Sequence, residues 1–184
     1  TSGESMSSAL RELLASYRSA SKTEREKGTY FELLIKDFLK NDPTYYPQFS
    51  EVWTYKDWAE SQGIDSRDIG IDLVAGLSEE EGFCAIQCKF YDEHHRIQKS
   101  DLDSFFTASG KKGFTRRLIV DSTSGAWSEH AETALSNQTI ETQRIGLSEL
   151  ENSPIDWSVY APNKPVKLKA KKTPRDHQIT AINA

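Results

Sequence analysis

Two apolar segments joined by a short acidic turn constrain the fold of this chain most strongly. Residues 69–76 and 83–91 have the β-branched and apolar composition of strands, and residues 77–82 form a polar connection that ends in glycine. We therefore predict a β-hairpin near the middle of the sequence. Asp72 interrupts the first apolar segment, and a carboxylate in such a place is costly unless it is paired or used.

The hydrophobic periodicity around this hairpin predicts a mixed α/β fold. A polar connection is expected over 58–68, between the first two strands. Apolar residues recur at helical spacing in some segments and alternate or cluster as in strands in others. The expected helices span 7–20, 23–40, 101–109 and 129–137, with a helical turn at 148–152, and the further strands span 49–55, 117–120 and 142–145. This order of elements predicts a central mixed β-sheet flanked by helices.

Length and composition support one soluble domain. The chain has 184 residues, of which 36% are hydrophobic and 28% charged. No apolar run approaches the roughly 20 residues needed to span a bilayer, so no membrane association is expected. Cys84 and Cys88 lie four residues apart in one predicted strand, roughly 13 Å along it, which is too far for a disulfide. We predict two buried thiols in a reducing cytoplasm.

The charge distribution excludes one class of function. Residues 162–184 contain six basic residues and one acidic residue, a balance of +5. Because the whole chain carries −5, residues 1–161 carry −10. A protein that binds nucleic acid through a generally basic surface is therefore excluded, whereas a nuclease with a local acidic metal site remains compatible.

The predicted hairpin brings candidate catalytic residues together. Strand periodicity places Gln87 and Lys89 on one face of the second strand, and Asp72 in the first strand is then expected to lie opposite them. Upstream, Glu32 shares a helical face with Gly28 and apolar residues, so it is expected to point inward. An acid, a ligand-x-Lys about fifteen residues later and a helical Glu before both form the pattern of PD-(D/E)xK nucleases.

The chemistry of phosphodiester hydrolysis explains these residue types. A divalent ion polarises the phosphate and lowers the pKa of the attacking water, and Mg²⁺ prefers oxygen ligands. We predict Asp72 as the charged ligand, with the side-chain oxygen of Gln87 and the backbone carbonyl of Cys88 as neutral ligands. Lys89 would orient water or stabilise charge on the phosphate. Glu32 would act through water or as a ligand, and Mn²⁺ would substitute for Mg²⁺.

Basic residues after the second hairpin strand are candidates for contacts with DNA phosphate, although solvated polar loops have the same composition. They are His94, His95, Arg96, Lys99, Lys111 and Lys112.

Three motifs resemble a known nuclease family. Residues 70–74 (GIDLV) together with 86–89 (IQCK) resemble the Mrr-like branch of PD-(D/E)xK nucleases, in which Gln commonly occupies the middle ligand position. Residues 28–32 (GTYFE) are similar to the first-helix motif of that family. The resemblance covers about residues 23–145 and implies the restriction-endonuclease-like fold and a metal-dependent DNA endonuclease.

The C-terminal segment extends the resemblance. Residues 173–178 (TPRDHQ) resemble the adenine-recognising Q-motif of superfamily 2 helicase-like ATPases. A nuclease before such a motor resembles type ISP, single-polypeptide restriction–modification enzymes. This implies a division into an expression scar and start (1–6), a nuclease domain (7–160), a basic linker (161–174) and the start of a truncated ATPase (175–184).

The resemblance also implies the partners of the domain. Its substrate would be double-stranded DNA in the bacterial cytoplasm, cut one strand at a time by a monomer without sequence specificity of its own. ATP and S-adenosylmethionine would be used by motor, coupler, methyltransferase and target-recognition parts outside this chain.

Two alternatives remain open from the sequence. One is a free-standing DNA repair or junction nuclease of the same fold, which the linker and helicase-like tail disfavour. The other is a non-catalytic DNA-binding or coupling module, which the uncharged Gln87 keeps open because it supplies one negative charge fewer than the usual Asp or Glu.

Overall fold

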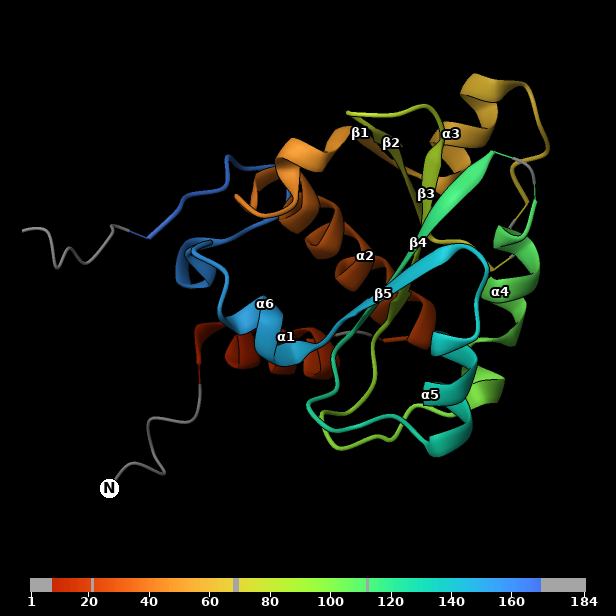
Figure 1. Cartoon of the computed structure of the whole chain (residues 1–184). Coiled ribbons are helices and arrows are strands. Elements are labelled where there is room, and N and C mark those ends of the chain that lie inside the picture. The colour runs from red at the N-terminus through yellow and green to blue at the C-terminus, as the bar shows by residue number, and fades with distance from the viewer. Residues whose placement is uncertain (1–7, 21, 68–69, 112, 170–184) are drawn as a thin grey trace, which may run out of the picture.

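The computed structural model describes residues 8–20, 22–67, 70–111 and 113–169. A five-stranded sheet lies at its centre with strand order β1-β2-β3-β4-β5 (Figure 1). The strands are β1 (Phe49–Thr54), β2 (Leu73–Leu77), β3 (Phe83–Lys89), β4 (Phe114–Asp121) and β5 (Glu141–Ile145). The first three strands pair antiparallel and the last two join in parallel, so the predicted mixed sheet is confirmed.

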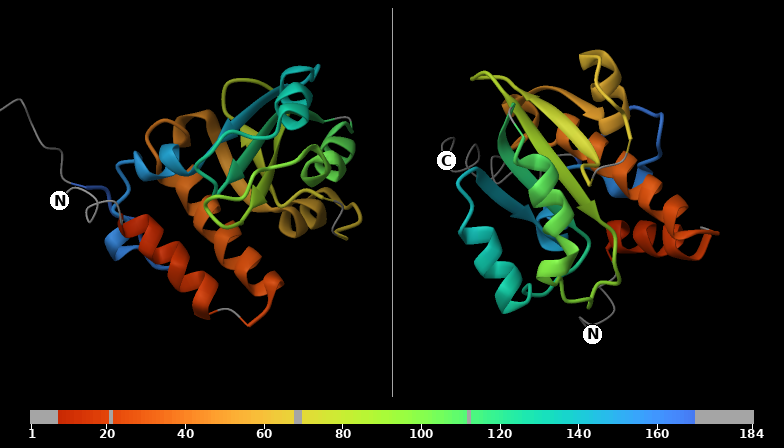
Figure 2. Two further views of the ribbon diagram at one scale, coloured as in Figure 1. Left: turned by 90° about the horizontal axis from the view of Figure 1, so that it is seen from below. Right: turned by 90° about the vertical axis from the view of Figure 1, so that its right-hand side faces the viewer.

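Helices cover both faces of the sheet, as two further views show (Figure 2). One face packs against α1 (Ala9–Ala20), α2 (Glu24–Asn41) and α6 (Leu147–Glu151), whereas the other packs against α3 (Tyr55–Gln62), α4 (Asp103–Ser109) and α5 (Glu129–Ser136). Short 3₁₀ turns occur at Tyr46–Gln48, Lys99–Asp101 and Trp157–Val159. No helix in the described ranges combines the length and apolarity needed to cross a bilayer.

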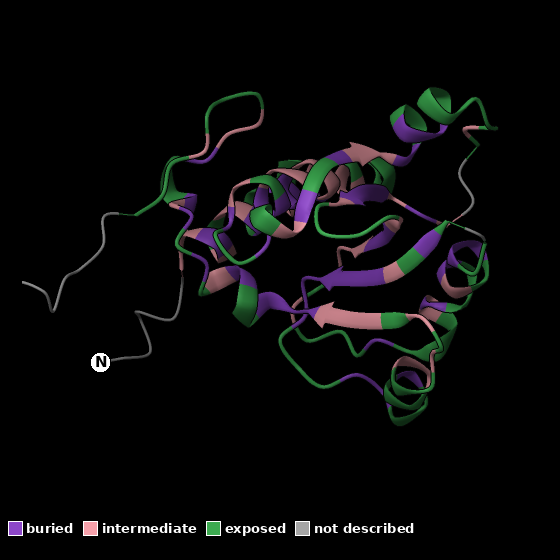
Figure 3. Cartoon of the chain, turned by 45° about the horizontal axis from the view of Figure 1, so that its top comes forward, coloured by how far each residue is buried: buried purple, intermediate pink, exposed green. Residues whose placement is uncertain are grey.

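The alternation of side chains along the strands produces a separate core on each face. Phe31 of α2 packs with Ile86 of β3 in one core, and Phe105 of α4 packs with Ile119 and Trp127 in the other. The central strands are accordingly buried along most of their length (Figure 3). Burial of each such side chain contributes about 1.5–3 kcal/mol, which makes the sheet a rigid support for the residues at its ends.

The predicted connection over 58–68 is wrong in its first part, which is helical. Helix α3 begins immediately after β1, because the Thr54 side chain accepts a hydrogen bond from the Asp57 N–H at 3.2 Å. Gly63 ends the helix in the left-handed conformation, with φ 70°. An N-cap residue and a C-terminal glycine are ordinary helix boundaries. Thr54 directly follows a strand-like segment, so the sequence pattern did not indicate that it is an N-cap.

The first hairpin strand also begins later than predicted. Strand β2 starts at Leu73, so Asp72 directly precedes the strand and does not lie within it. Gly70 has φ 100°, and a Cβ atom added there would lie 3.0 Å from the Ser104 carbonyl oxygen in α4. A backbone in this region favours glycine, and the close approach to α4 leaves no room for a side chain. The turn at Gly70 therefore sets where Asp72 enters the sheet.

Two other predicted elements differ in extent. The helix expected over 101–109 is divided into a 3₁₀ turn at Lys99–Asp101 and α4, and the strand expected over 117–120 extends over Phe114–Asp121 as β4. The remaining predicted helices and strands are confirmed to within a few residues at each end.

The segment after residue 160 folds back onto the domain over its described part. Ile155 and Leu168 form an antiparallel bridge, and the Lys169 N–H donates to the Pro154 carbonyl oxygen at 2.7 Å. Residues 1–6 and 170–184 lie outside the described residues. The expression scar and the helicase-like tail therefore remain predictions, as do the domain boundaries.

Candidate active site

Asp72 is held by the backbone of two neighbouring elements. Its N–H donates to the Ile86 carbonyl oxygen at 3.0 Å, and its own carbonyl oxygen accepts from the Tyr55 N–H at 3.0 Å. Its carboxylate turns towards β3, where Oδ2 accepts hydrogen bonds from Gln87 Nε2 at 2.5 Å and from the Cys88 N–H at 2.7 Å. The structure thus brings Asp72 and Gln87 together, as the hairpin register predicts.

Gln87 presents a buried oxygen beside Asp72. The side chain is only 5% exposed, and its Oε1 atom has no hydrogen-bond partner in the described part of the chain. A buried acceptor without a partner costs about 1–3 kcal/mol. The two ends of a glutamine amide exchange by rotation of the terminal torsion. A cation at Asp72 would give this oxygen a partner, so the residues present fit a metal ion.

The backbone of Cys88, rather than its thiol, is the candidate ligand. Burial raises the pKa of its thiol well above the usual value, and the negative charges of Asp72 and Glu32 raise it further. The thiol therefore stays protonated and makes a poor metal ligand. In an extended strand the N–H and carbonyl of one residue face the same edge, so the Cys88 carbonyl lies on the side where its N–H meets Asp72.

Lys89 lies half-buried at the end of β3. The Ser122 N–H holds the Lys89 backbone by donating to its carbonyl oxygen at 3.0 Å. The Lys89 ammonium has neither a hydrogen bond nor an ion pair with any described residue, and its charge lowers the pKa of the Cys88 thiol. The charges of Lys89 and Asp72 thus both act on the Cys88 thiol, and no ion pair with a described residue engages the Lys89 ammonium.

Glu32 faces the same site from α2. It is half-buried and lines, together with Asp72, an open pocket of about 470 Å³ between α2 and the start of β2. Glu32 thus turns towards Asp72, in agreement with the inward orientation expected from the helical face that it shares with Gly28, which also lines the pocket.

The donor set suits a hard divalent cation. No group of three or more His, Cys, Asp or Glu side chains with metal-binding geometry occurs in the described ranges. The available donors are the Asp72 carboxylate, the Gln87 amide oxygen and the Cys88 carbonyl, with Glu32 nearby. All are oxygen atoms, as Mg²⁺ prefers, and the low number of charges fits an ion that keeps several waters.

Sequence reasoning missed two basic residues at this pocket. Arg25 lies in the first turn of α2 and Lys56 in the first turn of α3, and both line the pocket that contains Asp72 and Glu32. Arg25 lies three residues before Gly28 in the first-helix motif, which is a weak signal. For Lys56 the sequence offers no such signal, because helix α3 itself was not predicted.

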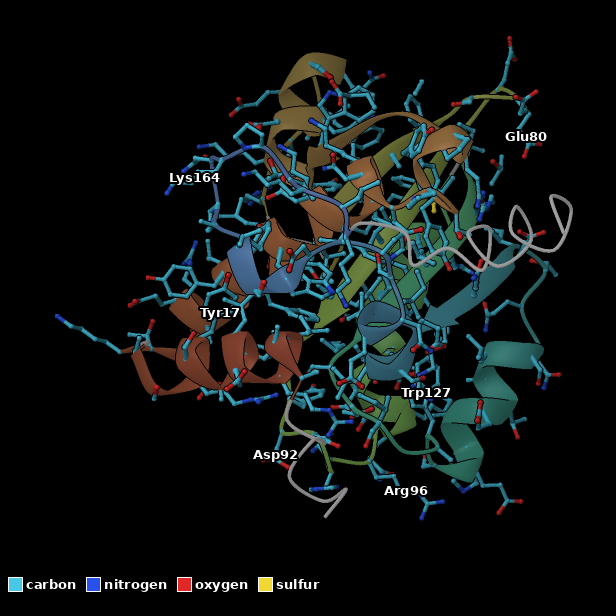
Figure 4. All side chains as sticks on the ribbon, turned by 90° about the vertical axis from the view of Figure 1, so that its left-hand side faces the viewer. Tyr17, Glu80, Asp92, Arg96, Trp127 and Lys164 are labelled. Carbon is cyan, nitrogen blue, oxygen red and sulfur yellow. The ribbon has the colours of Figure 1, made fainter. Side chains whose placement is uncertain are left out.

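The structure separates the predicted phosphate contacts into exposed and engaged residues. His94, Arg96 and Lys111 are exposed, and Lys112 lies outside the described residues. Figure 4 shows Arg96 at the end of the domain opposite Glu80 in the acidic β2–β3 turn. An anionic ligand at the Asp72 end of β2 would therefore lie away from this acidic turn.

The other two predicted phosphate contacts already have partners. His95 stacks on Tyr91 with ring centroids 4.1 Å apart, and its Nε2 lies 3.6 Å from Asp101 Oδ2. Burial and the nearby Asp101 charge raise the pKa of Tyr91 to about 12. Lys99 forms an exposed ion pair with Asp103 at 2.9 Å. DNA would have to displace these contacts.

Comparison with known proteins identifies the family of the chain. Residues 40–167 match the family model Mrr_cat_2, described as a restriction endonuclease. The chain belongs to this restriction endonuclease family. No curated protein matches the chain.

Two solved structures resemble this restriction endonuclease domain. One is the ATP-dependent type ISP restriction–modification enzyme LlaBIII bound to DNA, with 37% identity and a TM-score of 0.68 over 87% of this chain. The restriction endonuclease domain spans about a tenth of that enzyme, 10% of its length. The other is the MspJI restriction endonuclease in complex with a 27-mer oligonucleotide, with 14% identity and a TM-score of 0.49, covering 79% of this chain and 31% of that chain.

Proposed function

We propose that this restriction endonuclease domain hydrolyses DNA phosphodiesters with Mg²⁺, nicks one strand at a time and has no sequence specificity of its own. The observation that carries the proposal is the contact of the Asp72 carboxylate with the Gln87 amide and the Cys88 N–H, near Lys89, whose ammonium has no partner among the described residues. These residues would supply an oxygen-lined cation site and a positive charge at one end of β3.

Each residue has a distinct part in this mechanism. Asp72, the Gln87 oxygen and the Cys88 carbonyl would hold the ion, which when bound supplies charge neutralisation at the phosphate and a lower pKa of water. Lys89 donates hydrogen bonds to the attacking water or to the phosphate, where negative charge develops. Glu32 accepts a hydrogen bond from a water in the pocket and so fixes its position.

The similarity to LlaBIII suggests how the domain is used. That enzyme is described as ATP-dependent and bound to DNA. By analogy we assign double-stranded DNA as substrate here, and we assign ATP-driven translocation and S-adenosylmethionine-dependent methylation to other domains of the same polypeptide. The absence of a base-reading motif and the net charge of −10 on residues 1–161 support delivery of DNA by such domains.

Plasmid nicking with Mg²⁺ or Mn²⁺ tests the proposal. Asp72→Asn and Lys89→Gln are each expected to lower the nicking rate by about 10²–10⁴-fold, the range for loss of a positioned catalytic group. Glu79→Gln and Lys164→Gln are exposed controls of the same charge change, far from the pocket, and should nick like the parent. Circular dichroism checks that the variants remain folded.

Metal titration by calorimetry separates the alternatives. Mg²⁺ binding that Asp72→Asn removes, without nicking by the parent, would indicate chemistry that waits for delivered DNA. Unchanged nicking by Asp72→Asn would refute the assigned site. Absence of both metal binding and nicking would favour a non-catalytic DNA-binding module.

A further inference from the structure

The active-site pocket carries two positive charges besides its carboxylates. Glu32 and Asp72 line it from α2 and from the start of β2, and Arg25 and Lys56 line it from the first turns of α2 and α3. Residues from three separate elements thus place two acids and two bases around a space of about 470 Å³. This volume admits a small segment of a nucleic-acid strand rather than a whole duplex.

The side chains of Arg25 and Lys56 have no polar partners in the part of the chain that the structure describes. Neither side chain makes a hydrogen bond or an ion pair with another described residue, although both are exposed and near acids. Neighbouring cations do have ion-pair partners: Lys27 pairs with Glu24 at 2.6 Å, and Arg67 pairs with Asp65 at 2.6 Å. The donors of Arg25 and Lys56 therefore remain available to a ligand.

The chemistry of the pocket indicates what that ligand is. A phosphate that approaches Asp72 and Glu32 is repelled by two negative charges. A bound divalent cation would reduce this repulsion for the reacting phosphate but not for the phosphates on either side of it. Cations held beside the carboxylates reduce the repulsion of the flanking phosphates. Arg forms bidentate contacts with phosphate oxygens, and Lys supplies a compact charge. Both lie in the first turn of a helix, where the positive end of the dipole favours the same anion.

We propose that Arg25 and Lys56 form a phosphate-binding pair that holds the backbone of the DNA strand next to the scissile phosphate. This inference rests on the proposed nuclease function and deepens it by assigning the residues that seat the substrate strand. Lys89 acts at the reacting phosphate, whereas Arg25 and Lys56 determine which stretch of strand enters the pocket.

The salt dependence of DNA binding tests this pair directly. The full 184-residue chain is titrated against a short fluorescent duplex in EDTA, which prevents cleavage, and anisotropy measures the dissociation constant at several salt concentrations. Each phosphate contact contributes about 0.9 to the slope of log K against log salt, so Arg25→Gln and Lys56→Gln should each lower the slope by about 0.9 and the double variant by about 1.8.

A matched double variant controls for net charge. Lys164→Gln combined with Lys167→Gln removes the same two charges from exposed positions outside the pocket. Its slope should equal that of the parent. If the pocket variant and the control have the same slope, or if the parent shows no salt-dependent binding to the duplex, the assignment of Arg25 and Lys56 is refuted.

The outcome is distinguishable from failure of the nuclease function. If the slope is lower in the pocket variant but the parent shows no metal-dependent nicking, the phosphate-binding pair is supported and the catalytic proposal is refuted. If the parent nicks DNA but the Arg25→Gln, Lys56→Gln double variant has an unchanged KM, the nuclease function is supported and the phosphate-binding pair is refuted.

Discussion

Replacement of Gln87 by Glu tests the core of the site, because it restores the charge that most PD-(D/E)xK nucleases have at this position. In the structure the Gln87 amide donates to Asp72 Oδ2 at 2.5 Å. Gln87→Glu removes this donor and places a second carboxylate against the first. Without metal the variant should be destabilised, and with Mg²⁺ it should gain an additional negative ligand.

The magnitude follows from the geometry. Two unit charges roughly 4 Å apart repel by about 1 kcal/mol in bulk water and by about 4 kcal/mol at an effective dielectric constant of 20. Because Gln87 is only 5% exposed, the upper part of this range applies. We expect the free energy of unfolding in EDTA to fall by about 2–4 kcal/mol. Mg²⁺ at 100 times its Kd would return about 2.7 kcal/mol.

Urea denaturation in EDTA and in saturating Mg²⁺ measures both effects. Gln143→Glu in β5 is the matched control, since Gln143 is half-buried and donates to the Tyr45 hydroxyl at 3.1 Å rather than to a carboxylate. Its stability should not gain from Mg²⁺ beyond the gain of the parent. If Gln87→Glu is as stable as the parent in EDTA, or if Mg²⁺ stabilises it no more than the parent, the assigned geometry is refuted.

Two further predictions concern stability and are checked by thermal and urea denaturation. Gly28→Ala should raise the free energy of unfolding by about 0.5–1 kcal/mol, because a Cβ there meets no atom within 4 Å and a helix favours alanine. Gly70→Ala should lower it by at least about 1–2 kcal/mol, because Gly70 has a φ of 100° and lies against Ser104. Equal effects of the two variants would contradict the strained turn at Gly70. Arg144→Met should lower the free energy of unfolding by about 3–5 kcal/mol, because it leaves the fully buried Asp121 without its ion pair at 2.8 Å. A change of less than about 1 kcal/mol would show that this ion pair does not stabilise the fold.

The position of the candidate site was predictable because it depends on local pairing. A hairpin with a short turn allows few registers, and a shift by one residue would expose the apolar face of β3. The observed register pairs Leu73 with Ile86, so Asp72 comes next to Gln87. The sheet, its mixed pairing and most helix positions likewise follow from apolar periodicity.

The parts that sequence reasoning missed depend on contacts between distant segments. Helix α3 has few apolar residues, and its start at Thr54 follows a strand-like segment without a break, so periodicity favoured the strand. Lys56 and Arg25 line the same pocket because α2 and α3 pack on the two faces of the sheet. No pattern within either segment indicates it.

The position of Asp72 depends on its backbone more than on its side chain. Its N–H bonds to Ile86, its carbonyl accepts from Tyr55, and the preceding turn at Gly70 abuts α4. These three anchors come from β3, α3 and α4, and none involves the carboxylate. Asp72→Asn should therefore keep its place in the sheet while losing its charge. Loss of metal binding and nicking in that variant would then report the chemistry of the carboxylate rather than collapse of the site.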